Sequence, residues 1–195
     1  MNTPSPSFVT VVAGLPRSGT SMMMQMLAAG GMPVLGDNIR QADEDNLRGY
    51  YEFEPVKRTK DDASWLADAR GHVVKMVYAL LVDLPADYEY RVVFMHRNLD
   101  EVLASQAKML ERRSEKGASI STDRLRSVFS EQLEKVRTWL EDQPHFDVMQ
   151  IDYGDAINDP ECQVRRISDF LGGGLNLALM AAAVDRSLYR QKRDR

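Results

Sequence analysis

Short apolar runs alternate with amphipathic segments along most of this chain. The apolar runs are rich in β-branched and aromatic residues, and they predict strands at 8–13, 72–76, 91–96 and 147–152. Apolar positions at helical spacing predict helices at 20–29, 55–69, 99–113, 122–142, 160–171 and 175–188. A second apolar stretch follows at 78–84, and 154–159 is predicted to be a turn. Strands that alternate with helices favour a three-layer α/β fold, with a mostly parallel central sheet and helices on both faces.

The junction between the first strand and the first helix carries the clearest chemical signal. The run from 8 to 13 ends in a loop bounded by Gly14 and Gly19, and a helix-like segment begins at Ser21. Glycines let the backbone curl so that successive N–H groups point at one anion, and the helix start adds the positive end of its dipole. Arg17 places a fixed cation inside the loop. The pattern predicts a phosphate-binding loop.

This loop departs from that of nucleotide kinases at one position. The kinase loop reads G-x-x-x-x-G-K-[ST], and here Thr20 stands where the lysine should be. A loop without that lysine is poorly suited to the β- and γ-phosphates of ATP. The segment instead resembles the 5′-phosphosulfate loop of sulfotransferases, P-[KR]-S-G-T-[ST], which binds the sulfuryl donor 3′-phosphoadenosine 5′-phosphosulfate (PAPS). The resemblance implies donor binding by Pro16, Arg17, Ser18, Gly19, Thr20 and Ser21.

A second segment is similar to the same family. The strand-like run at 91–97 ends in Arg97, a helix follows, and Ser105 lies eight positions further on. The stretch 96–105 resembles the family's R-N-P-x-D-x-x-x-S, with Leu99 in place of the proline. In the family this Arg and this Ser contact the 3′-phosphate of the donor. The resemblance implies the same role for Arg97 and Ser105, which would also reject ATP.

A third match lies nearer the C-terminus. Tyr153 ends a strand-like run, Pro160 can open a helix, and 167–172 reads I-S-D-F-L-G. This order resembles the family's Y-E-D-L…D-P…I…F-L-G, in which the tyrosine often lies near the adenine, so Tyr153 is a candidate nucleobase contact. The segment 43–54 also resembles the N-P-x-G-Y-x-E stretch of bacterial members. Together the matches resemble a bacterial PAPS-dependent sulfotransferase with a P-loop-NTPase-like fold.

The resemblance implies transfer of a sulfuryl group from PAPS to a hydroxyl or amine of a small-molecule acceptor, with adenosine 3′,5′-bisphosphate as the product. No metal is expected, because arginine and the helix dipole carry the charge. The acceptor proton needs a base, but Val77 stands where cytosolic members have a histidine. The predicted catalytic residues are Arg17, Glu52, Glu54 and Lys75. Weaker candidates for the base are Asp43, Glu44 and His72.

Two other functions stay open. One is a small-molecule kinase of the P-loop class that uses ATP and Mg²⁺, which Thr20 and the missing carboxylate after 91–96 disfavour. The other is a non-catalytic nucleotide-binding homologue that kept the donor site and lost the base. Single residues also have structural alternatives, since Arg97 could be a salt-bridge partner and Ser105 a residue of a helix face.

Composition excludes several classes of protein. The chain has 195 residues, of which 44% are hydrophobic, and this suits one domain over 1–195 with 1–7 flexible. A net charge of −4 leaves no basic footprint for nucleic acid. The single cysteine, Cys162, excludes an internal disulfide framework.

The ends and the surroundings of the chain are also predicted. No apolar run reaches the roughly 20 residues that span a bilayer, and the N-terminal segment lacks the features of a signal peptide. We therefore expect a cytoplasmic protein without a membrane or nucleic-acid partner, and a homodimer is possible because the family often forms one. A basic tail either frays in solvent or reaches the 3′-phosphate; its residues are Arg190, Lys192, Arg193 and Arg195.

Overall fold

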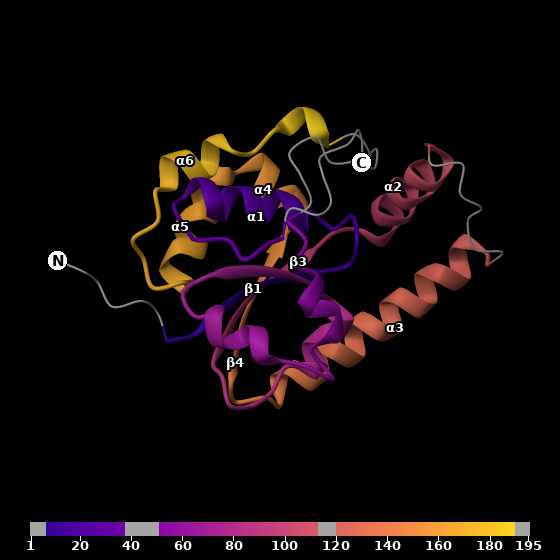
Figure 1. Cartoon of the computed structure of the whole chain (residues 1–195). Helices are drawn as coiled ribbons and strands as arrows, with labels where there is room; N and C mark the ends of the chain where they lie inside the picture. Colours follow the sequence, from indigo (N-terminus) through magenta and orange to yellow (C-terminus); the bar gives the residue numbers. More distant parts are fainter. Residues whose placement is uncertain (1–6, 38–50, 113–119, 190–195) are drawn as a thin grey trace.

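Four strands form a parallel sheet in the order β2-β1-β3-β4 in the computed structural model, which describes residues 7–37, 51–112 and 120–189. The strands are β1 (Val9–Gly14), β2 (Val73–Val77), β3 (Tyr90–His96) and β4 (Phe146–Asp152). Each predicted strand is confirmed to within one residue at either end. The predicted α/β class is confirmed as well, because helices lie on both faces of this sheet (Figure 1).

The first face is covered by four helices that lie together in Figure 1. They are α1 (Thr20–Ala29), α4 (Tyr153–Asn158), α5 (Pro160–Phe170) and α6 (Leu177–Ala182). Successive side chains of a strand point to opposite faces, so Val12 and Val93 pack here against Met23 and Met26 of α1. All four side chains are fully buried. Met23, Met24 and Met26 of the loop helix are therefore core residues.

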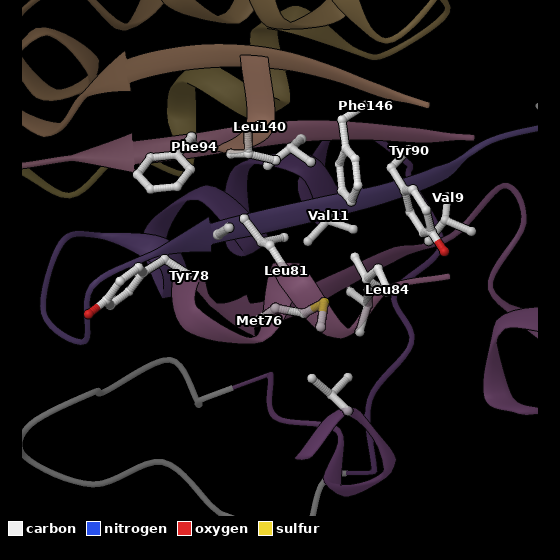
Figure 2. Packing of buried hydrophobic residues seen from close by; sticks show 14 of the residues in the cluster. Val9, Val11, Met76, Tyr78, Leu81, Leu84, Tyr90, Phe94, Leu140 and Phe146 are labelled. Carbon is white, nitrogen blue, oxygen red and sulfur yellow. The ribbon is translucent and has the colours of Figure 1, made fainter. Parts of the chain in front are cut away.

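The second face packs against α3 (Thr122–Glu141) and several short 3-10 helices, with α2 (Leu99–Arg112) beside α3. Figure 2 shows this core, in which side chains of β1, β3 and β4 meet Leu140 of α3. Phe146 stacks on Tyr90 with ring centroids 4.8 Å apart. Both faces of the sheet are thus buried, and ligands can reach the sheet only at its edges.

Two helical predictions are wrong in their extent. The helix predicted over 55–69 is two 3-10 helices, η1 (Glu54–Arg58) and η2 (Ser64–Asp68). Asp62 Oδ1 accepts a hydrogen bond from the N–H of Ser64 at 3.0 Å, and such a local bond competes with helix continuation. The apolar stretch at 78–84 is a further 3-10 helix, η3 (Tyr78–Asp83).

The C-terminal third differs from its prediction in a similar way. The segment predicted as a turn is α4, because Asp152 Oδ1 accepts from the N–H groups of Gly154 and Asp155 at 2.7 and 3.2 Å and starts a helix there. The helix predicted over 175–188 is divided into α6 and η4 (Arg186–Leu188). Asp185 caps the second piece by accepting from the N–H of Ser187 at 3.0 Å.

The carboxyl ends of the strands meet at one edge of the sheet. Gly14 pairs in register with Val77 on one side and with Met95 on the other, and His96 pairs with Asp152. Ligands of open parallel sheets bind beyond this edge. The three sequence motifs follow β1, β3 and β4, so the fold brings them to the same edge.

In the ranges that the structure describes, no helix combines the length and the apolar character that crossing a bilayer needs.

Candidate functional site

The loop between β1 and α1 closes tightly against its neighbours. A Cβ on Gly14 would lie 2.5 Å from Ser18 Oγ and 2.8 Å from the carbonyl oxygen of Met95. Gly19 has a φ of +100°, and a Cβ there would lie 2.4 Å from Cδ2 of Tyr153. These separations are too short for any side chain, so both positions need glycine. The loop is therefore fitted to the end of β3 and the start of α4.

The start of α1 has the features of an anion site. Gly19 occupies the N-cap position, no side chain caps the helix, and its first turn carries no acidic residue. The N–H groups of a first turn lack intrahelical acceptors and form the positive end of the dipole. Ser18 Oγ, in a residue only 1% exposed, is a buried atom without a hydrogen-bond partner. An unpaired buried hydroxyl is costly, and together these features fit a phosphate group.

Arg17 joins the loop to the second motif. Its φ of 73° is uncommon for a residue with a side chain. Its Nε donates to Ser105 Oγ at 3.0 Å, across 88 positions of sequence. Its carbonyl oxygen accepts from Arg97 Nη1 at 3.1 Å, across 80 positions. Arg17 of the first motif is thus in direct contact with both Arg97 and Ser105 of the second motif.

Arg97 is buried and carries a second partner. It is 8% exposed, and its Nε donates to Oε2 of Glu101, also 8% exposed, at 3.0 Å. Its guanidinium carbon lies 4.3 Å from the ring centre of Tyr153, a cation–π contact. Arg97 is therefore a salt-bridge partner as well as a neighbour of the loop. Separating the two buried charges would leave each without its partner, which is costly. The pair therefore holds the Arg97 guanidinium in place.

Two tyrosines complete the β3 side of the site. Tyr153 opens α4, and burial raises the pKa of its phenol, while the charge of Arg97 opposes that rise. Tyr189 donates from its hydroxyl to Glu101 Oε1 at 3.0 Å. Burial, followed by this hydrogen bond and the charge of Glu101, raises the pKa of Tyr189 to about 12. Both phenols are therefore protonated at neutral pH.

Glu101 and Tyr189 are site residues that sequence reasoning missed. Glu101 lies in the first turn of α2, four positions after Arg97, which precedes the helix, and this short spacing between opposite charges is a signal that could have found the pair. Tyr189 follows the short η4 helix, and its partner is 88 positions away. No local pattern marks such a contact, because only the tertiary fold brings the two residues together.

The β2 side of the loop is different in character. Lys75 is half-buried and pairs in register with Val12. Val77 pairs with Gly14, at the level where the loop begins, and is 42% exposed. The position that carries a histidine in cytosolic sulfotransferases therefore presents an apolar side chain to solvent beside the loop.

Glu52 and Glu54 lie outside β2, away from Arg97 and Ser105. The N–H of Leu35 donates to the carbonyl of Val73 at 2.9 Å, so the segment after Leu35 continues beside β2. The N–H of Asp37 then donates to the carbonyl of Glu52 at 3.1 Å, and the N–H of Glu54 donates to Asp37 Oδ2 at 2.6 Å. Moving outward from β1 in space, the neighbouring segments are β2, then the segment that contains Asp37, then the segment that contains Glu52.

The four predicted catalytic residues come from three places in the fold. Arg17 is bonded to Ser105 on the β3 side, Lys75 belongs to β2, and the two glutamates lie beyond it. Glu54 pairs with Lys57, and this hydrogen bond is the main cause that raises the pKa of the Lys57 ammonium. The charges of Glu52 and Asp37 add to the rise.

The remaining candidates lie elsewhere. His72 precedes β2, at the amino edge of the sheet opposite the loop, and its Nδ1 lies 3.1 Å from the carbonyl oxygen of Arg70. Outside the described residues lie Asp43, Glu44, Arg190, Lys192, Arg193 and Arg195. Within the described ranges, no three His, Cys, Asp or Glu side chains gather as a metal site would require.

Comparison with known proteins gives a family and a fold. The family model described as "Sulfotransferase domain" matches residues 9–194. No curated protein matches the chain in sequence. Among solved structures, the sulfotransferase domain from the curacin biosynthetic pathway is similar with a TM-score of 0.58 and 16% identity, over 96% of this chain and 90% of that one.

Two further solved structures share the fold. Sulfotransferase STF1 from Mycobacterium tuberculosis H37Rv has a TM-score of 0.55 and 16% identity, over 94% of this chain and 72% of that one. Retinol dehydratase, solved with androsterone and the inactive cofactor PAP, has a TM-score of 0.53 and 17% identity, over 93% of this chain and 64% of that one. At these identities the likeness concerns the fold, while the matched family model concerns the sequence itself.

Proposed function

The chain belongs to the sulfotransferase family, and from this premise we propose that it is a PAPS-dependent enzyme. It transfers a sulfuryl group from PAPS to a hydroxyl or amine of a small-molecule acceptor and releases adenosine 3′,5′-bisphosphate. The observation that carries the proposal is the meeting of Arg17, Ser105 and Arg97 at the glycine-bounded loop. These are the residues that the family resemblance assigns to the two phosphate groups of the donor.

The β3 side of the loop would hold the donor. The first-turn N–H groups of α1, with the hydroxyls of Thr20 and Ser21, suit the 5′-phosphate. Arg97 and Ser105 suit the 3′-phosphate, and Tyr153 suits the adenine. Retinol dehydratase, which shares the fold, is solved with PAP, and this supports a donor of that chemical class. When bound, PAPS supplies the sulfuryl group and a phosphate leaving group.

Arg17 would be the main cation that stabilises the leaving group. Sulfuryl transfer develops negative charge on the leaving oxygen, and a preorganised cation lowers the free energy of that charge. The bonds of Arg17 to Ser105 and Arg97 hold it in place before the ligand arrives. Lys75, in β2, is the proposed second cation.

Glu52 is the proposed general base for the acceptor. Val77, which pairs in register with Gly14 where the loop begins, carries no proton acceptor. Glu52 lies on the β2 side, which the donor residues leave to the acceptor. A carboxylate there would take the proton of the attacking hydroxyl or amine.

Calorimetric titration tests the donor assignment. We expect adenosine 3′,5′-bisphosphate to bind at micromolar strength, about −8 kcal/mol, and ATP with Mg²⁺ to give no binding. Binding of ATP without binding of the bisphosphate would favour the kinase instead. Transfer of labelled sulfate from PAPS to a panel of alcohols, phenols and amines then separates an enzyme from a non-catalytic homologue, since the latter binds the bisphosphate and labels no acceptor.

A further inference from the structure

Tyr189 touches the buried ion pair on which the proposed donor site depends. Its hydroxyl donates to Glu101 Oε1 at 3.0 Å, while Glu101 Oε2 accepts from Arg97 at 3.0 Å. The Tyr189 and Tyr153 rings meet edge to face with centroids 5.2 Å apart. The Arg97 guanidinium carbon lies 5.4 Å from the Tyr189 ring centre. One side chain from the end of the described chain therefore contacts three residues of the site.

The segment that carries Tyr189 is fixed along α4. Arg186 donates from Nε to the carbonyl of Ile157 at 3.2 Å and from Nη2 to that of Asn158 at 3.3 Å. These carbonyls end α4, where helix acceptors lack intrahelical partners. At the other end of the helix, Tyr189 Oη lies 3.8 Å from the place of a Cβ on Gly154. The segment 185–189 thus spans α4 and brings the phenol to Glu101.

Glu101 poses an electrostatic problem for an anion site. Its carboxylate is 8% exposed and is bonded to the guanidinium that would receive a phosphate. Two anions on one cation repel each other, and burial leaves that repulsion poorly screened. A hydrogen bond from a neutral phenol stabilises one carboxylate oxygen and fixes its position. Tyr189 supplies that bond without adding charge.

We propose that Tyr189 is a positioning residue of the donor site, which holds the Glu101 carboxylate so that Arg97 can receive the 3′-phosphate. This inference rests on the proposed function and adds a residue to it. Tyr189 acts through Glu101 and Arg97, so its effect concerns ligands that carry a 3′-phosphate. The affinity for ligands that lack the 3′-phosphate should not depend on the Tyr189 hydroxyl.

The test compares two ligands on Tyr189→Phe, which keeps the ring and removes the hydroxyl. Calorimetry is run with adenosine 3′,5′-bisphosphate and with adenosine 5′-phosphate, beside the wild type. We expect the variant to bind the bisphosphate about five- to twentyfold more weakly, near the low end of the effect of a hydrogen bond to a charged group, because Tyr189 acts on the ligand only through Glu101 and Arg97. Affinity for adenosine 5′-phosphate should change by less than about twofold, which is within the scatter of independent sites.

Two further variants sharpen the result. Tyr90→Phe removes a hydroxyl that donates to the Pro85 carbonyl at 2.9 Å, at the amino edge of the sheet, and should bind both ligands as the wild type does. In a Glu101→Gln background, Tyr189→Phe should weaken bisphosphate binding by less than about twofold, because the two residues act as one unit.

Each other outcome decides against a claim. Equal loss of both ligands in Tyr189→Phe, or unchanged bisphosphate affinity, overturns the role of Tyr189 and leaves the donor site standing. An undiminished effect of Tyr189→Phe in the Glu101→Gln background overturns the route through Glu101. A wild type that does not bind the bisphosphate overturns the proposed function and this inference together.

Discussion

The two sides of β1 hold their polar side chains by contacts of very different range. On the β3 side, Arg17 bonds to Ser105 across 88 positions, and Tyr189 bonds to Glu101 across 88. On the β2 side, Glu54 bonds to Lys57 across 3 positions and to the Asp37 side chain across 17. The two bonds named on the β3 side depend on the tertiary fold, whereas the two named on the β2 side join positions that are near in sequence. In the proposed function, the β3 side would hold the donor and the β2 side would face the acceptor.

The largest expected effect probes the β2 side. Replacing Glu52 by Gln should lower kcat by about 10²- to 10⁴-fold, the usual contribution of a general base, while bisphosphate affinity stays at the wild-type value. Sulfate-transfer kinetics and calorimetry measure the two quantities. Glu54→Gln is the matched variant and should retain most of the turnover. If both variants turn over normally, the base lies elsewhere and the functional contrast between the two sides fails.

On the β3 side, Arg97→Ala should weaken bisphosphate binding by about 100-fold, as expected for loss of a charge-assisted phosphate contact. The same change leaves Glu101 buried without its cation and should lower the free energy of unfolding by about 3–5 kcal/mol. Denaturant titration and calorimetry check both effects. Arg126→Ala removes an exposed arginine bonded to Asp100 at 2.8 Å and should change neither quantity appreciably. Similar losses in the two variants would argue against a locked donor side.

The fit of the loop can be tested with two glycines that have similar positive φ angles, Gly19 and Gly31. Gly31 has a φ of +96° with nothing within 4 Å of an added Cβ, so Gly31→Ala should cost about 1 kcal/mol of stability from backbone strain alone. Gly19→Ala adds a clash with the Tyr153 ring and should cost about 1–3 kcal/mol more. Thermal unfolding of the two variants measures the difference. Equal costs would mean that Tyr153 moves aside easily.

The smallest expected effect is a pH dependence at the Tyr189–Glu101 contact. The pKa of Tyr189 is raised from 10.0 to about 12 in the folded protein, so the folded state holds this proton more tightly than the unfolded chain. The resulting stability is present below pH 10 and is lost as the pH rises through about 12. Unfolding measured over this range should show a shallower loss in Tyr189→Phe than in the wild type. If stability falls equally with pH in Tyr189→Phe and in the wild type, the loss is due to groups other than Tyr189.

The sequence predicted the regular parts of this molecule well, because they depend on local patterns. Short apolar runs are enough to locate β1 and β4, because the strands of a parallel sheet that is covered by helices on both faces are largely apolar. The sequence-based prediction failed where a single side chain decides whether a helix starts or stops. Asp152 starts α4 in a segment predicted as a turn, and Asp62 interrupts the helix predicted over 55–69.

The sequence by itself determined the loop, its cation and the motif spacing, and with these the family of the chain. Glycine, arginine and serine have to stand at fixed offsets for a backbone to wrap a phosphate, so this information is local. Only the tertiary structure decided that Arg17 meets Ser105 and that Tyr189 reaches Glu101. Contacts across 88 positions depend on how strands and helices pack, and no spacing along the chain encodes them.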